Sequence, residues 1–304
     1  MKLGLQSAIL ADYSFDEVMK YIGEQGFACV ELMSWPLGKA ERRYAGVTHV
    51  DADALDAAAI QHIKDTAEKN KLEISGLGYY PNALDPDKEK SDFYVEHIKK
   101  VITAAKKLSV PVVNTFIGRD PAKNLEDSFK QFKSVWPQII KHAEAEGVKV
   151  AIENCAMFFS MDEWPGGKNL ASTPAIWRRM FEEIKSDFFG LNYDPSHLIW
   201  MQMDYIKPIY EFKDKLFHIH IKDAKVMKQN LDDVGIMATP LEFHSPKLPG
   251  LGDVDWGKFM SALTDVRYDG ACCIEVEDRA FESSPEDIKK SITISKRFME
   301  QYMF

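Results

Sequence analysis

The sequence predicts an α/β fold, a (β/α)8 TIM barrel formed by a single domain over residues 1–304. Short β-rich runs alternate with long amphipathic segments along the whole chain, which is typical of repeated βα units around a parallel sheet. Eight such units can be counted, and a barrel of this kind typically needs about 250 residues, so the chain has room for loop insertions. No Pro-, Gly- or Ser-rich linker divides the chain.

The predicted strands follow in order at the β-rich runs Lys2–Gln6, Cys29–Leu32, Glu73–Leu77, Val112–Phe116, Val148–Glu153, Phe189–Asp194, Phe217–Ile221 and Ala271–Glu277. Several helices between them have start signals: Ser91 opens one, and Thr173-Pro174 and Ser284-Pro285 place proline in the first turn of two others. A doubly wound open sheet is the alternative. It usually carries GxGxxG after its first strand, where this chain has SAILADYS.

Two long connections stand out, Ala156–Ser172 after the fifth strand and Ala224–Gly252 after the seventh. Long loops in compact domains are usually functional. Because both follow strands, we expect them on the catalytic face of the barrel.

Composition excludes some classes of partner. The 38 basic residues and 47 acidic residues give a net charge of −9, which repels nucleic acids and anionic membranes. The chain has no apolar segment of transmembrane length and no signal-peptide pattern, so we expect a cytoplasmic protein. The four cysteines, Cys29, Cys155, Cys272 and Cys273, lack CxxC spacing and are predicted to be small buried hydrophobic residues.

Four consecutive predicted strands end in residues that can bind metals: Glu153, Asp194, His220 and Glu275. The active site of such a barrel lies at the carboxyl ends of its strands, and adjacent strands lie about 4.8 Å apart. Buried carboxylates that converge need a cation. Three carboxylates and one imidazole suit Mn²⁺, Mg²⁺ or Co²⁺ better than a closed structural zinc site, and we favour one Mn²⁺, with Zn²⁺ as a further option.

Other polar residues near these strand ends are candidates for catalysis. His197 follows Asp194 by three residues and is predicted to bind substrate or act as an acid–base partner. Lys222 shares the inward face with His220 and is predicted to stabilise an oxyanion or donate a proton, the alternative being an ion pair with Asp223 or Glu277.

Substrate walls are predicted from aromatic residues after the strands. Trp35 and Trp164 are the favoured walls, with Phe116 and Asn114 as further substrate contacts. His244, in the second long loop, could close over the site, but a surface histidine is the favoured interpretation. The arginines 42, 43, 119 and 279 are possible anion contacts, but no glycine-rich phosphate loop is evident, which favours an unphosphorylated substrate.

The segments VAIENC, NYDPSHL, HIHIKD and PGLGDVDWGKF…YDGACCIEVED resemble the xylose isomerase-like TIM-barrel family, the sugar phosphate isomerase/epimerase group, over nearly the whole chain. The resemblance implies that one divalent metal is bound by Glu153, Asp194, His220 and Glu275. It places the DxxH histidine, a substrate or metal contact, on His197, and it implies frequent oligomers, so a homo-oligomer is expected.

The chain departs from two groups within that family. The ketose 3-epimerases carry a further glutamate and a further arginine where this chain has Phe159 and Val226, which weakens a specific prediction of 3-epimerisation. Endonuclease IV binds three zinc ions through additional histidines that are not matched here.

These observations predict an isomerase or epimerase of a small sugar, keto-sugar or inosose that works through a metal-stabilised enediolate, with Glu153 and Glu275 moving the proton. A lyase or dehydratase of a keto-inositol or 3-keto-glycoside uses the same intermediate and stays open. A non-catalytic sugar-binding barrel is the third hypothesis.

Overall fold

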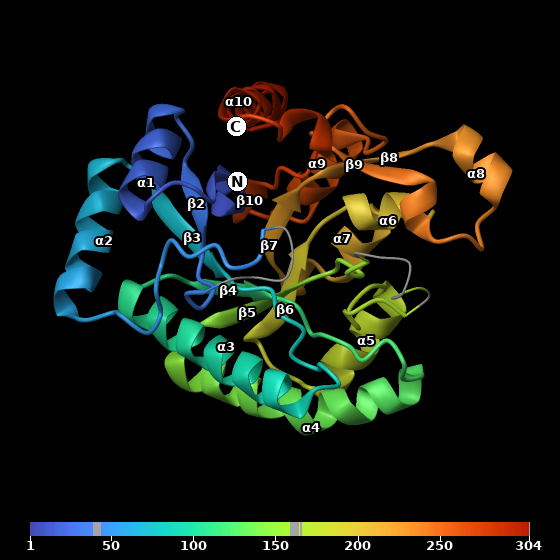
Figure 1. Cartoon of the computed structure of the whole chain (residues 1–304), viewed down its shortest axis with the longest axis horizontal. Coiled ribbons are helices and arrows are strands. Elements are labelled where there is room, and N and C mark those ends of the chain that lie inside the picture. Colours follow the sequence, from blue (N-terminus) through green and yellow to red (C-terminus); the bar gives the residue numbers. More distant parts are fainter. Residues whose placement is uncertain (39–43, 159–163, 165, 304) are drawn as a thin grey trace.

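The computed structural model describes residues 1–38, 44–158, 164 and 166–303. At its centre the described chain forms a closed barrel of parallel strands in the order β1-β10-β7-β6-β5-β4-β3-β2 (Figure 1), which confirms the predicted fold class. The strands are β1 Lys2–Gln6, β2 Cys29–Met33, β3 Glu73–Gly78, β4 Val112–Thr115, β5 Lys149–Glu153, β6 Phe189–Tyr193, β7 Leu216–Ile221 and β10 Ala271–Ile274. The last strand is three residues shorter than predicted, so Glu275 and Glu277 lie beyond the barrel wall.

Helices cover the outside of the barrel (Figure 1). They are α1 Phe15–Glu24, α2 Ala57–Lys69, α3 Lys88–Leu108, α4 Leu125–Glu146, α5 Pro174–Glu183, α6 Ser196–Trp200, α7 Lys207–Glu211, α8 Lys228–Val234, α9 Trp256–Asp265 and α10 Pro285–Glu300, with short 3₁₀ turns at Ser7–Leu10, Lys213–Lys215, Pro240–Glu242 and Arg279–Phe281. Among the described helices, none is both long and apolar enough to cross a bilayer.

Two of the three predicted helix starts are confirmed, and one is wrong. Thr173 and Ser284 cap α5 and α10, each accepting a backbone N–H three residues on. The helix predicted to open at Ser91 begins at Lys88, because the Asp87 carboxylate accepts the N–H groups of Glu89 and Lys90. Ser91 is buried inside the helix and donates to the Ala83 carbonyl at 2.7 Å.

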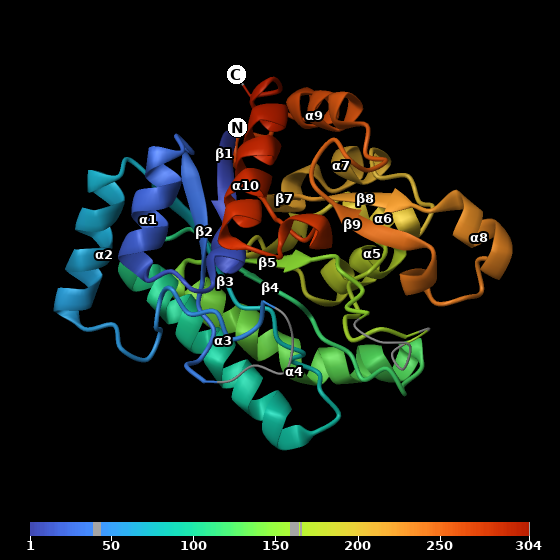
Figure 2. The same cartoon turned by 45° about the horizontal axis from the view of Figure 1, so that its top comes forward.

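The connection predicted as a long loop after the seventh strand contains a β-hairpin instead. Its strands, β8 Asp223–Val226 and β9 His244–Lys247, pair antiparallel, and α8 projects beyond them, away from the barrel (Figure 2). The buried Asp223 carboxylate accepts from Ala224, Gly250 and Val254 and from the Trp256 indole, so it fixes the base of the hairpin rather than forming an ion pair. Strands of four mostly polar residues show too little alternation of hydrophobic and polar residues to be recognised from a sequence.

The amino-terminal end of the barrel interior is filled by small residues. A side chain at Gly4 would come within 2.6 Å of the Cys29 sulfur and 2.7 Å of the Cys273 sulfur, so the glycine leaves room for both thiols. Cys29, Cys272 and Cys273 are buried as predicted. Cys155 is an exception, since it is only half-buried and lines the cavity described next.

Candidate active site

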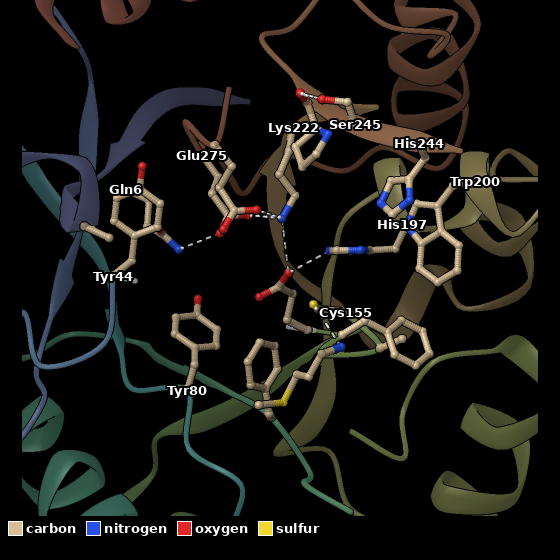
Figure 3. Close-up of a pocket in the computed structure, with 18 of the residues that line it drawn as sticks. Gln6, Tyr44, Tyr80, Cys155, His197, Trp200, Lys222, His244, Ser245 and Glu275 are labelled. Atoms are coloured by element: carbon tan, nitrogen blue, oxygen red, sulfur yellow. Dashed lines mark hydrogen bonds and ion pairs between the residues drawn. The ribbon is translucent and has the colours of Figure 1, made fainter. Parts of the chain in front are cut away.

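A cavity of about 680 Å³ lies at the carboxyl ends of the barrel strands (Figure 3). Its polar lining includes residues at or just after the ends of five strands: Gln6, Glu153, His197, Lys222 and Glu275. The long connections after β5 and β7 also contribute to the lining, through residues 155–158, 241 and 244–246. The described parts of both connections that line the cavity therefore lie at the catalytic end, as the sequence predicted.

Two of the four predicted metal ligands, Glu153 and Glu275, line this cavity, and the other two, Asp194 and His220, are in ion-pair contact with the residues that line it. Glu153 ends β5, Asp194 and Glu275 directly follow β6 and β10, and His220 lies in β7. The Nδ1 atom of His220 lies 3.2 Å from Oε2 of Glu275 and 3.8 Å from Oε2 of Glu153. All four side chains are buried. Ligand atoms this close can share one ion, because adjacent parallel strands deliver them to the same edge.

The Lys222 ammonium lies among these carboxylates. It is 2.8 Å from Glu275, as Figure 3 shows, 3.0 Å from Glu277 and 3.1 Å from Asp194. Burial disfavours the charged amine, but the surrounding carboxylates outweigh it and hold the pKa of Lys222 well above its usual value. The site is thus built around a positive charge.

The two glutamates on either side of this charge differ in their ionisation. Burial opposes ionisation of Glu153, yet Lys222 and two imidazoles hold its pKa well below the usual range. Burial raises the pKa of Glu275, reinforced by the negative charges of Glu153 and Glu277. Different environments thus separate the proton affinities of two neighbouring carboxyl groups.

Glu31 is a buried acid that sequence reasoning missed. Its Oε2 lies 2.7 Å from Nε2 of His220, and it also accepts a hydrogen bond from the Tyr80 hydroxyl. It lies inside β2 rather than at a strand end, and the β2–β3 register shifts between Val30 and Glu31. The feature of the sequence that could have revealed Glu31 is an acidic residue within the otherwise apolar run CVELM.

A second histidine lies near Glu31, deeper in the barrel. His218 contacts Oδ1 of Asn192 at 3.0 Å and the Ser75 hydroxyl at 3.3 Å. Burial lowers its pKa to about 4, so it is neutral near pH 7. The Asn192 amide also lies 3.0 Å from Nε2 of His220, which connects the two histidines.

His197 reaches the same carboxylates from α6. Its Nε2 lies 3.2 Å from Oε1 of Glu153 and 3.2 Å from Oδ2 of Asp194. Burial opposes its protonation, but Cys155 and Asp194 raise the pKa of His197 well above the usual value. It lines the cavity, in reach of a substrate.

Some of the predicted substrate contacts line the cavity and others do not. Trp35 and Phe116 line the cavity, whereas Asn114 and Trp164 do not appear among its described lining residues. Asn114 is fully buried in β4, and Trp164 packs on Phe158 with ring centroids 5.6 Å apart. Their roles toward a substrate stay predictions.

His244 is not the surface residue that the sequence suggested. It lines the cavity and stacks on Trp200, with ring centroids 5.0 Å apart and 25° between the planes (Figure 3). The β8–β9 hairpin, which the sequence did not predict, carries it there. Residues 42, 43 and 159 lie outside the described part of the chain, and Arg119 donates to the carbonyls of Gly166 and Lys123.

The buried donor set fits a divalent metal. Among the described residues, Nδ1 of His220 and Oδ2 of Asp194 form no hydrogen bond, although both are buried. Each lies close to a charged neighbour: Nδ1 is 3.2 Å from Glu275, and Oδ2 is 3.1 Å from Lys222. Glu153, His220 and Glu275 each offer a ligand atom within 4.8 Å of the others. Buried charged groups need opposite charge nearby, and a divalent ion held by these ligands would supply it.

Comparisons with known proteins agree with this fold. The profile of the family described as "Xylose isomerase-like TIM barrel" matches residues 19–298. The chain is 26% identical to the uncharacterized protein YfiH of Bacillus subtilis (strain 168), covering 99% of this chain and 100% of that protein. It is 24% identical to an inosose dehydratase of Lactiplantibacillus plantarum over 41% of each chain.

Solved structures share the architecture at low identity. The 3-keto-D-glucoside 4-epimerase YcjR from E. coli superposes with a TM-score of 0.70 at 17% identity, covering 98% of this chain and 99% of that one. The IolI protein with a bound zinc atom has a TM-score of 0.71 at 17% identity, covering 100% and 99%. These likenesses support the fold.

Proposed function

Because the chain belongs to the xylose isomerase-like TIM-barrel family, we propose that it is a divalent-metal-dependent isomerase or epimerase of a small sugar, keto-sugar or inosose. One observation carries the proposal: Glu153, at the end of β5, and Glu275, just after β10, face the same nitrogen, Nδ1 of His220. A substrate bound at this point would have a carboxylate on either side, an arrangement that suits removal of a proton from carbon and its return to another carbon or another face.

The metal would be held by Glu153, Asp194, His220 and Glu275, and the oxygen-rich set favours Mn²⁺, Mg²⁺ or Co²⁺. When bound, a divalent cation polarises the oxygens of a hydroxy-ketone and makes the adjacent C–H bond acidic.

The protein's own groups then move the proton. One of the two glutamates removes it from carbon and the other returns it. Return to the opposite face of the same carbon gives an epimer, and return to the neighbouring carbon gives an isomer. His197 is placed to hold a substrate hydroxyl, and Trp35 and Phe116 offer flat apolar surfaces to a sugar ring.

Deuterium exchange tests this proposal. The protein loaded with Mn²⁺ is incubated with a panel of keto-sugars and inososes in D₂O, and the products are analysed by NMR and mass spectrometry. We expect one carbon-bound deuterium in the product, and loss of exchange in both Glu153→Gln and Glu275→Gln. Glu73→Gln, at a half-exposed site on β3, is the matched control. Sugar binding without exchange under any metal would favour a non-catalytic barrel.

A dehydratase is the second candidate. Lys222 contacts both Glu275 and Glu277, and Glu277 lies at the edge of the cavity with a side chain 32% exposed. An ammonium at this position can donate a proton to a departing hydroxyl group. In the same experiment, a product lighter by one water would favour this reaction over epimerisation.

A further inference from the structure

We propose that Glu153, Cys155 and His197 form a second metal site, selective for a zinc-like ion, beside the metal site proposed above. This inference goes beyond the proposed function and shares one residue, Glu153, with it. The three side chains each offer a ligand atom within 4.8 Å of the other two. One oxygen, one sulfur and one nitrogen, with the cavity on the open side, correspond to the three protein ligands of an open zinc site.

The Glu153 carboxylate is oriented to serve both sites. Its Oε2 faces Nδ1 of His220 at 3.8 Å, whereas its Oε1 faces Nε2 of His197 at 3.2 Å. Ligand atoms around one tetrahedral zinc lie about 3.2–3.8 Å apart, given bonds of about 2.0–2.3 Å. The nitrogen of His197 is therefore at ligand spacing on the side of the carboxylate away from His220.

A further buried carboxylate lies beside this site. Oδ2 of Asp194 is fully buried and lies 3.2 Å from Nε2 of His197 and 3.1 Å from the Lys222 ammonium. Around it the carboxylates of Glu153, Asp194, Glu275 and Glu277 face one ammonium, that of Lys222. Carboxylates gathered in this way can serve as ligands for an added cation.

The sulfur distinguishes this site from its neighbour. Cys155 is half-buried and lines the cavity, while the three other cysteines are buried in the barrel. Its sulfur accepts the backbone N–H of Met157 at 3.3 Å, which fixes the position of the side chain. Thiolate ligands select zinc-like ions over Mn²⁺ and Mg²⁺, so the two sites should prefer different metals.

The backbone around the site is held rigidly in place. Nδ2 of Asn169 donates to the carbonyls of Glu153 and Cys155, at 3.0 and 2.6 Å. Asn154 and Asp194 exchange two hydrogen bonds, which join the ends of β5 and β6 and so set Glu153 against His197. Rigid support of this kind lowers the cost of binding an ion.

Cobalt titration of the full-length, metal-free protein tests the inference. We expect two Co²⁺ per wild-type chain and a near-ultraviolet thiolate-to-cobalt absorption band. Cys155→Ser should bind one Co²⁺ without the band, and Cys272→Ala, which removes a buried thiol in β10, should bind two and keep it. One Co²⁺ and no band in the wild type, or a band that survives in Cys155→Ser, would overturn the inference.

Thiol labelling gives a second measurement that does not depend on a variant. Maleimide should modify Cys155 in the native metal-free protein, and Zn²⁺ should slow that labelling at least tenfold while Mn²⁺ does not. Equal labelling with and without Zn²⁺ would count against the site. The two proposals can be contradicted independently. Mn²⁺-dependent turnover in a protein that lacks the cobalt band would contradict only the second metal site. A cobalt band in a protein without turnover would contradict only the proposed function.

Discussion

Nε2 of His220 lies 2.7 Å from Oε2 of Glu31, and the other ring nitrogen, Nδ1, is turned toward Glu153 and Glu275. A carboxylate that binds one ring nitrogen of a histidine orients the ring and with it the other nitrogen. Glu31 is thus a positioning residue for His220, because its contact with Nε2 turns Nδ1 toward the other predicted metal ligands.

Glu31→Gln is expected to weaken Mn²⁺ binding by about 10- to 100-fold, because an amide orients the imidazole less strongly than a carboxylate does. Calorimetric titration of the metal-free protein measures the change. Glu73→Gln, on the neighbouring strand with a half-exposed side chain, should bind Mn²⁺ as the wild type does. Unchanged affinity in Glu31→Gln would show that His220 is oriented by other contacts.

Lys222→Met is expected to destabilise the metal-free protein by about 3–5 kcal/mol, because it leaves buried carboxylates without their cation. Added divalent metal should then raise the free energy of unfolding more in the variant than in the wild type. Urea unfolding with and without Mn²⁺ measures both effects. Lys258→Met, which removes an exposed ion pair with Asp255, should change stability by less than about 1 kcal/mol.

Asn169→Ala is expected to lower the free energy of unfolding by about 2–4 kcal/mol. The buried Asn169 side chain accepts from the backbone of Ile117, Gly118 and Ala171, in addition to its two donor contacts after β5. Removing it leaves several buried backbone groups unbonded. Asn230→Ala, at an exposed position on α8, is the control and should stay within about 0.5 kcal/mol of the wild type.

Stability should fall as the pH drops from about 6.5 to about 4. Burial lowers the pKa of His49 to about 4, with the ring between the Ser7 hydroxyl and the Leu10 carbonyl. An unfolded histidine binds its proton near pH 6.5, so the stabilisation is complete above that pH and is lost progressively below it. At pH 5 this residue alone should cost about 2 kcal/mol.

Urea unfolding of the metal-free protein at pH 7 and pH 5 checks this. His218 and His244 have pKa values lowered to about 4 as well, so the wild-type loss should exceed the contribution of one residue. In His49→Gln the loss between the two pH values should be smaller by about 2 kcal/mol. A variant with the full wild-type loss would contradict the assignment.

The site residues that the sequence predicted are those that lie at or near the ends of strands. Glu153, Asp194 and Glu275 lie at or near the ends of predicted strands, and parallel strands bring such ends to one edge whatever the details of packing. Glu31 was missed because it lies within a strand. Whether a mid-strand side chain faces the barrel interior or its helices depends on register, and the β2–β3 register shifts next to this residue.

The sequence by itself determined the alternation of strands and helices, hence the barrel, and the residues that reach its catalytic end. Only the tertiary structure decided which groups pair there. Glu31 and His220 are 189 residues apart, and the position of Lys222 among the carboxylates results from side chains of four separate segments. Hydrophobic periodicity is a local property, whereas proton position, ion pairing and the stacking of His244 on Trp200 depend on contacts that exist only once the barrel has closed.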